Sequence, residues 1–417
     1  MTTRPQLPRQ GGERRVAILV ESPLSERDAA RFGAEALQRA GFSVEYWELA
    51  PLTLPRAEQQ WADRARDVRI HRMESLDALT DACRSLSSRD VVISILGVAR
   101  GEAERCREVL AIVSNAPSTF CGVIGRAPWD ESYPDIQSRP YQDEWGALEF
   151  ALLRIRYSLA HAVAKALSFV KNGPFVLPRR RRRMGIRPLD DVFLAASSCA
   201  VDPLLTDSST RTHVVHSFDY DLIRGIAATP YEECDSIAFI DGLGPLHPDF
   251  ATLALELPQS TPELYFARMR CAFDWIEEAT GMAVTIAAHP RARPGILEEA
   301  YGNRRVVYGG TAQVVATSRC VLLNHPSDAV TVVVGLRRPA LVLESSADFR
   351  YQRDLKAALS RQLGWRRLEV ESLPTSITLP QIDVGRYERF FRQFIRESRQ
   401  DTGSFWDVVA KGLVLDA

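Results

Sequence analysis

The sequence predicts an α/β protein with two Rossmann-like domains that face each other across a cleft. Its 417 residues exceed the size of one ordinary domain, so two are expected. Short apolar runs alternate with helix-length segments along most of the chain. The clearest runs lack polar alternation, which is typical of parallel strands buried on both faces. These runs are Val284–Ala288, Arg305–Gly309, Cys320–His325 and Ala340–Glu344.

The first domain begins with a strand, a helix and a second strand. A buried strand is expected over Arg14–Glu21, and Phe42–Leu49 reads as the next strand. Between them, Ser25 is a candidate N-cap and Gly41 a C-terminal stop for one helix. This order opens a right-handed βαβ unit. Further strands of this domain are expected over Asp90–Gly97, Asp191–Ser198 and His213–Asp221.

A second α/β unit starts with the strand and Gly/Pro-rich loop of Ser236–Phe250. An amphipathic helix follows, with Thr261 as N-cap and Gly281 as its stop. The expected division is a disordered tail over residues 1–13, a first domain over 14–225, a second over 226–385, and terminal helices over 386–417 that pack back on the first domain.

Composition narrows the classes of function. A net charge of -1 gives no reason to expect nucleic-acid binding. The seven cysteines are scattered and form no C-x-x-C pair, which indicates a reducing compartment. The N-terminus lacks an apolar signal-peptide segment, and no run approaches the ~18 apolar residues that span a bilayer. We therefore expect a cytoplasmic protein.

Polar residues follow three of the strands in the second domain. Ligands of parallel sheets bind beyond the carboxyl ends of the strands, and arginine forks suit phosphate oxygens. Each group also has a purely structural alternative. The His-Pro and arginine residues could be a proline that ends a strand and arginines exposed to solvent, and the glycine, threonine and serine positions could be ordinary turns and N-caps. We expect a nucleotide-phosphate site formed by His289, Arg291, Arg293, Gly310, Thr311, His325 and Ser327.

Three groups of carboxylates are candidates for acid–base work. Asp241 lies at a strand end, where it could be a general base or hold a sugar hydroxyl, or only form an Asx turn. The run His-Ser-Phe-Asp-Tyr-Asp lies at the domain junction. Its side chains could act in acid–base catalysis or bind the acceptor, or they could be polar residues of a structural hinge. Their spacing fits no metal site. The third group is the first strand–helix loop, with Glu21, Arg27 and Asp28 facing the cleft.

The run Arg179–Arg183 is either a solvated loop or a contact for an anionic membrane surface or a phosphate-bearing acceptor. No Walker A sequence and no G-x-G-x-x-G are present. This counts against a P-loop NTPase and a conventional dinucleotide enzyme.

Several motifs together resemble bacterial proteins that build surface polysaccharides such as lipopolysaccharide and capsule. They are Glu21–Gly33, His216–Asp221, Phe239–Asp249, Ile286–Ala292 and Gly309–Ala312. The resembled proteins look like glycosyltransferases of the GT-B fold. The His-Pro motif with a strand-end serine is also similar to GT-B sialyltransferases and Kdo transferases, in which the histidine and serine bind the phosphate of a CMP-sugar.

The resemblance implies a glycosyltransferase that needs neither a metal nor a cofactor. Its donor would be a nucleotide sugar, CMP-linked if the similarity to sialyltransferases and Kdo transferases holds. Its acceptor would be a glycan or a lipid-linked molecule. The second domain would bind the donor and the first the acceptor, at the inner face of the membrane. The catalytic carboxylate would come from Asp241, Asp219 or Glu21, and acceptor contacts from Arg27, Asp28, His216 and Asp221. Alternatives are a GT-B-fold nucleotide-sugar epimerase and a non-catalytic polysaccharide-assembly protein.

Overall fold

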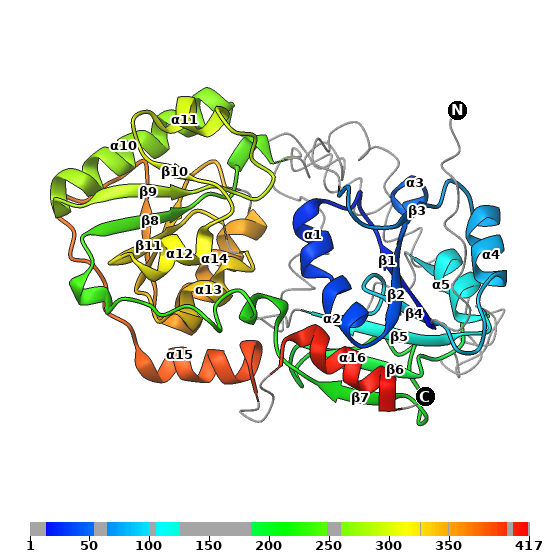
Figure 1. Ribbon diagram of the computed structural model, residues 1–417. Helices are drawn as coiled ribbons and strands as arrows, with labels where there is room; N and C mark the ends of the chain where they lie inside the picture. Colours follow the sequence, from blue (N-terminus) through cyan, green and yellow to red (C-terminus); the bar gives the residue numbers. More distant parts are fainter. Residues whose placement is uncertain are drawn as a thin grey trace, which may run out of the picture.

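The computed structural model describes residues 14–53, 65–99, 106–125, 185–247, 260–325, 327–348, 350–397 and 403–415. These residues form two α/β domains that lie side by side (Figure 1). The expected tail over residues 1–13 and the run Arg179–Arg183 lie outside the described residues. No helix in the described part of the chain is long and apolar enough to cross a membrane.

The first domain contains a parallel sheet with the order β3-β2-β1-β4-β5-β6-β7. Its strands are β1 (Arg14–Val20), β2 (Phe42–Glu48), β3 (Ile70–Arg72), β4 (Val91–Ser94), β5 (Thr119–Ile124), β6 (Asp191–Leu194) and β7 (Arg211–Val214). After β1 the chain places β2 and β3 on one side of that strand, and then β4 and the later strands on the other side. The carboxyl end of β1 therefore lies at the point where the strand order reverses, which is where open α/β sheets bind ligands.

Between β1 and β2 the first domain has two helices, where the sequence predicts one. The helices of this domain are α1 (Glu26–Arg31), α2 (Ala34–Arg39), α3 (Ala50–Thr53), α4 (Leu76–Arg84), α5 (Arg107–Ser114) and, from the C-terminus, α16 (Phe405–Leu415). The cap at Ser25 is confirmed, since its hydroxyl accepts from the backbone N–H of Asp28 at 3.1 Å. The single helix expected up to Gly41 is wrong. It is broken at Gly33, whose φ is 74° and against which the Trp406 ring packs.

The second domain repeats the architecture with the order β10-β9-β8-β11-β12-β13, again all parallel. Its strands are β8 (Ser236–Ile240), β9 (Ala283–Ala287), β10 (Val306–Val307), β11 (Cys320–Leu323), β12 (Ala340–Glu344) and β13 (Arg366–Glu369). Its helices are α10 (Pro262–Thr280), α11 (Ile296–Tyr301), α12 (Thr311–Ala316), α13 (Ala329–Gly335), α14 (Arg350–Leu363) and α15 (Val384–Phe390). The caps expected for α10 at Thr261 and Gly281 are confirmed.

The predicted fold class, two parallel α/β sheets in facing domains, is confirmed. Three of the apolar runs form buried strands as expected, and every residue of β11 is at most 1% exposed. The run Arg305–Gly309 does not, because β10 is a short edge strand whose residues are half-buried. The expected strand His213–Asp221 is wrong at its end. Its extended part stops at Val214, and Phe218–Tyr220 form a turn of 3-10 helix that Ser217 caps.

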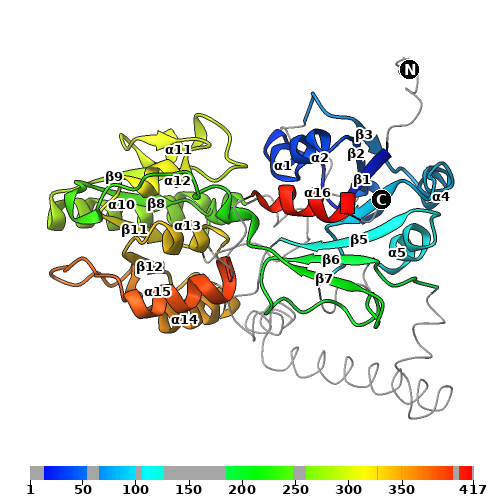
Figure 2. The ribbon, with the colours of Figure 1, turned by 60° about the horizontal axis from the view of Figure 1, so that its bottom comes forward.

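The C-terminal segment returns to the first domain after α15. Figure 2 shows α16 lying beside α1 and α2. The indole N–H of Trp406 donates to the carbonyl of Arg31 at 2.8 Å, and Asp407 pairs with Arg39 at 2.8 Å. The ring of Phe218 packs edge-on against Phe405, with centroids 4.6 Å apart. The helix α16 therefore completes the face of the first domain that carries α1.

Candidate functional site

The candidate site lies at the carboxyl edge of the second sheet, where β9, β8 and β11 are neighbours. The loops that follow these three strands share one edge of the sheet and face α1 of the first domain (Figure 1). Each loop carries a His-Pro pair: His247–Pro248, His289–Pro290 and His325–Pro326. The sheet order therefore brings together three histidines that are far apart in the sequence.

These three histidines are close to one another. The rings of His247 and His289 meet edge to face, with centroids 5.0 Å apart. A Cβ built on Gly242 would lie 2.8 Å from the Cβ of His325, so only glycine lets the loop after β8 approach that residue so closely. The sequence analysis chose His289 and His325 but missed His247. The third His-Pro pair was the signal that could have found it.

Burial and positive neighbours hold His289 in its neutral form. Desolvation, followed by the charges of His247, Arg291, Arg27 and His325, lowers the pKa of His289 to about 2. The Nδ1 atom accepts from the backbone N–H of Arg291 at 3.2 Å, which places the remaining proton on Nε2. His289 thus presents an N–H donor without adding a charge, in a region where cationic side chains gather.

Asp241 lies beneath the site rather than in it. It is 2% exposed, and its Oδ1 accepts from the hydroxyl of Tyr301 at 2.8 Å and from the N–H of Leu243 at 3.0 Å. The second bond is the Asx turn that the sequence left open. Burial raises the pKa of Asp241 to about 6, against the opposing hydrogen bonds from Tyr301, Leu243 and the backbone of His289. This carboxylate ties the loops after β8 and β9 to α11.

A layer of half-buried polar side chains continues below the strand ends. The amide of Asn324, after β11, donates to the hydroxyl of Tyr265 on α10. The Tyr265 ring lies directly under Gly244, where a Cβ would come within 2.5 Å of it. Burial raises the pKa of both Tyr265 and Tyr301. The loop that carries His247 therefore rests on neutral phenols.

The glycine-rich and serine positions of the predicted site begin the two helices that follow β10 and β11. Gly310 is the N-cap of α12 and Thr311 its first residue. Ser327 precedes α13, and its Oγ accepts from the N–H of Ala329 at 3.3 Å. Both positions serve as helix starts. They lie at the same sheet edge as the histidines.

The first domain contributes charges that reach the second. Arg31 of α1 pairs with Asp219 at 2.8 Å and lies 3.9 Å from Asp328, which precedes α13 in the other domain. Burial and the charge of Arg31 lower the pKa of Arg27, and the carboxylates of Asp28, Asp219 and Asp328 oppose this. α1 therefore faces the strand-end loops of the second domain.

The candidate carboxylates of the first domain lie in different settings. Asp219 is 2% exposed and is held by Arg31. Asp28 accepts from the hydroxyl of Ser25 at 2.9 Å within the cap of α1. Glu21 follows β1 directly and is half-buried. Of the three, Glu21 occupies the strand end at which the sheet order reverses.

The pair His216 and Asp221 supports the C-terminal helix. His216 is 1% exposed, and its Nε2 lies 3.1 Å from Oδ1 of Asp221. The other carboxylate oxygen of Asp221 accepts from the N–H of Phe405 at 2.9 Å. The His216 ring packs between Tyr220 and Phe405. These contacts fit the structural alternative for this run, and no group of three potential metal ligands occurs among the described residues.

The other predicted site residues, Arg291 and Arg293, are both exposed in the loop after β9. Arg291 contributes to the positive surroundings of His289. The backbone carbonyl of Arg293 accepts from the Tyr308 hydroxyl and from the N–H of Ile296, both at 3.4 Å.

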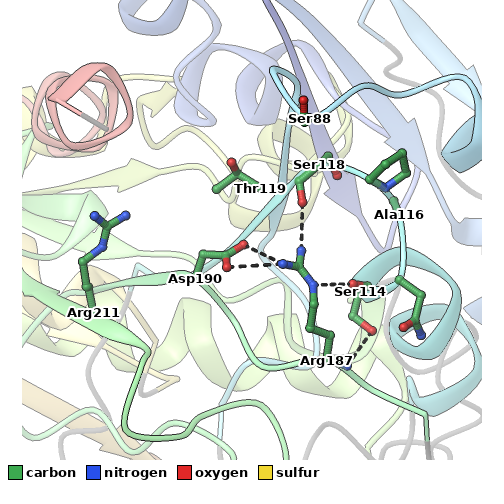
Figure 3. Close-up of a pocket in the computed structure, with 10 residues that line it drawn as sticks. Ser88, Ser114, Ala116, Ser118, Thr119, Arg187, Asp190 and Arg211 are labelled. Atoms are coloured by element: carbon green, nitrogen blue, oxygen red, sulfur yellow. Dashed lines mark hydrogen bonds and ion pairs between the residues drawn. The ribbon is translucent and has the colours of Figure 1, made fainter. Parts of the chain in front are cut away.

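A separate pocket of about 700 Å³ lies at the amino edge of the first sheet, where β5, β6 and β7 begin (Figure 3). Its central side chain, Arg187, donates to the carbonyls of Ser114 and Ser118 at 2.7 and 2.8 Å and pairs with Asp190 at 3.2 Å. These bonds fix the turn between α5 and β5. The pocket lies at the edge opposite the carboxyl end of β1, so it is not part of the candidate site.

Comparison with known proteins supports the fold. No protein-family model and no curated protein sequence matches the chain. The calicheamicin glycosyltransferase CalG4 superposes with a TM-score of 0.50 at 13% identity, over 97% of this chain and 100% of its own. The spinosyn forosaminyltransferase SpnP (TM-score 0.45, 12% identity, 97% and 99% covered) and Os79 from O. sativa in complex with UDP (0.44, 12%, 96% and 100%) are similar more loosely. The architecture is that of the GT-B class.

Proposed function

We propose that the protein is a glycosyltransferase that moves a sugar from a nucleotide-activated donor to a hydroxyl of an acceptor. The observation that carries this proposal is the group of three histidines on adjacent loops at the carboxyl edge of the second sheet. Imidazole N–H groups and the nearby guanidinium of Arg291 suit the oxygens of a phosphate. The GT-B fold supplies the context for such a donor.

In this proposal His289 donates its Nε2–H to a phosphate oxygen of the donor. His325 and Ser327 act from the next loop, and Gly310 and Thr311 border the nucleoside. As the bond to the sugar breaks, negative charge grows on the leaving phosphate. Preorganised donors stabilise that charge in the transition state more than in the ground state. The similarity of the His-Pro and serine pattern to sialyltransferases and Kdo transferases favours a CMP-linked sugar.

We assign the role of general base to Glu21. Asp241 and Asp219 are each 2% exposed and already hold Tyr301 and Arg31, so neither can reach an acceptor without breaking those bonds. Glu21 is half-buried at the switch point of the first sheet. There it would remove the proton of the acceptor hydroxyl as the sugar is transferred.

For the acceptor we propose a surface glycan or a lipid-linked precursor at the inner membrane face. The resemblance to surface-polysaccharide proteins supports this choice, as does the cationic run Arg179–Arg183. Acceptor contacts would come from Glu21, which follows β1, and from Asp28 in the first turn of α1.

Calorimetry with CMP, UDP, GDP and ADP tests the donor site, because a nucleotide that binds also stabilises the folded state. We expect one nucleotide to bind, and His289→Ala to weaken that binding by about tenfold or more, the loss of a hydrogen bond to a charged group. His71→Ala, an exposed histidine in β3, is the matched control. Absence of binding by every nucleotide would refute the proposal.

A non-catalytic glycan-assembly protein is the second candidate. The observation in its favour is that two of the three candidate bases are buried and engaged. Product analysis with the nucleotide sugar and acceptor extracts separates the two. Transfer that is lost in Glu21→Gln supports the enzyme, whereas nucleotide binding without product in the wild type supports the assembly protein. Product formed without an acceptor would instead indicate epimerisation.

A further inference from the structure

The α1 helix of the first domain carries Arg27 and Arg31 four residues apart, so both side chains lie on one face of the helix. Arg31 on that face lies 3.9 Å from Asp328 of the second domain. Two like charges at this spacing repel each other, and the charge of Arg31 contributes to the lowered pKa of Arg27. The helix therefore places two guanidinium groups on one face.

The two arginines differ in how well they are neutralised. Arg31 pairs with Asp219 at 2.8 Å, and its guanidinium lies over the ring of Phe218 at 5.5 Å. Arg27 has a carboxylate of Asp28 at 4.0 Å, the outer limit of an ion pair, and that carboxylate also accepts from the Ser25 hydroxyl. Arg31 is thus fixed in place, while Arg27 keeps a loosely held charge.

Arg27 also acts across the domain boundary. Its charge is among those that lower the pKa of His289, which belongs to the other domain. Its side chain as a whole is 47% exposed, so part of it is accessible. The charge of Arg31 disfavours the Arg27 cation, while the carboxylates of Asp28, Asp219 and Asp328 favour it. A bound phosphate would add a further anionic partner for Arg27.

We propose that Arg27, which belongs to the first domain, binds the phosphate of the donor. Arg31 positions the Arg27 side chain. This assignment deepens the proposed function and depends on it; it replaces the acceptor contact that the sequence suggested for Arg27. A phosphate held by His289 on one side and Arg27 on the other links the two domains.

The test compares the affinity of the protein for a nucleotide with its affinity for the corresponding nucleoside. Calorimetry is carried out with CMP and cytidine, and with UDP and uridine, on the wild type, Arg27→Gln and Arg27→Lys. We expect Arg27→Gln to weaken the phosphorylated ligand by about tenfold or more while the nucleoside binds as before, with partial recovery in Arg27→Lys. Raising the salt concentration should weaken nucleotide binding less in Arg27→Gln than in the wild type.

Arg84→Gln is the matched control, because Arg84 is 75% exposed in α4 and pairs only with the exposed Asp81 among described residues. Unchanged nucleotide binding in Arg27→Gln, together with weakened binding in His289→Ala, would overturn this inference and leave the proposed function standing. If Arg27→Gln weakened nucleotide and nucleoside binding equally, the inference would also be overturned, because Arg27 would then act on the structure of the site and not on the phosphate. A wild type that binds no nucleotide would refute both.

Discussion

The hydroxyl of Tyr301 donates a 2.8 Å hydrogen bond to the carboxylate of Asp241, and both side chains are buried. The bond joins α11 to the loop after β8. Since the same carboxylate holds the N–H of Leu243, whose φ is 59°, one acidic group sets the path of the loop that carries His247. Asp241 is thus placed to orient the site rather than to touch a substrate.

Removing the phenol hydroxyl should therefore destabilise the fold. In Tyr301→Phe the Asp241 carboxylate loses a donor in a buried place, which costs about 1–3 kcal/mol. Urea unfolding measures the difference. Tyr308→Phe is the control, because its hydroxyl bonds to Glu298 at 2.8 Å in an exposed setting, where we expect a change below about 0.5 kcal/mol. Equal effects of the two variants would contradict the assigned role of the Tyr301 bond.

Asp241 should also make stability depend on pH. Its folded pKa of about 6 lies above the ordinary value of 3.8, so the folded state binds its proton more tightly than the unfolded chain does. The favourable contribution of this group is complete below pH ~4 and disappears as the pH rises through about 6. Asp241→Asn keeps an acceptor for Tyr301 and cannot ionise.

The measurement is the difference in unfolding free energy between wild type and Asp241→Asn, taken at several pH values. We expect the wild type to lose up to about 3 kcal/mol relative to the variant between pH 4 and pH 6, since one pKa unit corresponds to ~1.4 kcal/mol. A difference that is flat over this range would show that Asp241 titrates normally. Retained sugar transfer in Asp241→Asn would independently exclude it as the base.

Gly33 should be intolerant of a side chain. Its φ is 74°, and a Cβ there would lie 2.1 Å from Cγ of Trp406. Gly33→Ala must therefore displace α16, at a cost of about 3 kcal/mol or more from overpacking and backbone strain. Tryptophan fluorescence and urea unfolding report the change. Gly41→Ala, with φ 89° and open space around it, carries only the backbone strain of about 1–2 kcal/mol; a similar loss in both would show that Trp406 packing is unimportant.

Local patterns were sufficient for the buried strands of the second domain and for the caps of α10. The runs at β9, β11 and β12 are apolar because both faces of that sheet are covered, and Thr261 and Gly281 act on backbone groups a few residues away. The short polar strands β3 and β13 gave no such pattern. They lie at sheet edges, where only one side pairs with a neighbour.

Features that depend on distant residues were not predictable. The break at Gly33 packs against Trp406, which comes from the other end of the chain. The burial of Asp241 depends on Tyr301 and on the loops that close over it. His247 joins His289 only because β8 lies between β9 and β11, and sheet order is a tertiary property. Sequence reasoning located the edge that holds the site but not which side chains face it.

The close approach of Gly242 to His325 gives a test of the site that does not remove any polar group. A Cβ on Gly242 would lie 2.8 Å from the Cβ of His325, so Gly242→Ala must push the loop after β8 away from that histidine. Because the displaced groups are at the edge of the domain, we expect a loss of about 1–3 kcal/mol in stability from overpacking. The larger effect should be on the affinity for the donor nucleotide.

Gly225→Ala is the matched control, since no atom lies within 4 Å of its Cβ position and its φ is not positive. Calorimetry on the two variants should show nucleotide binding weakened about tenfold or more in Gly242→Ala and unchanged in Gly225→Ala. An affinity that is the same in both would mean that the spacing of the three histidines does not matter for the ligand. In that case the donor phosphate does not lie between these loops.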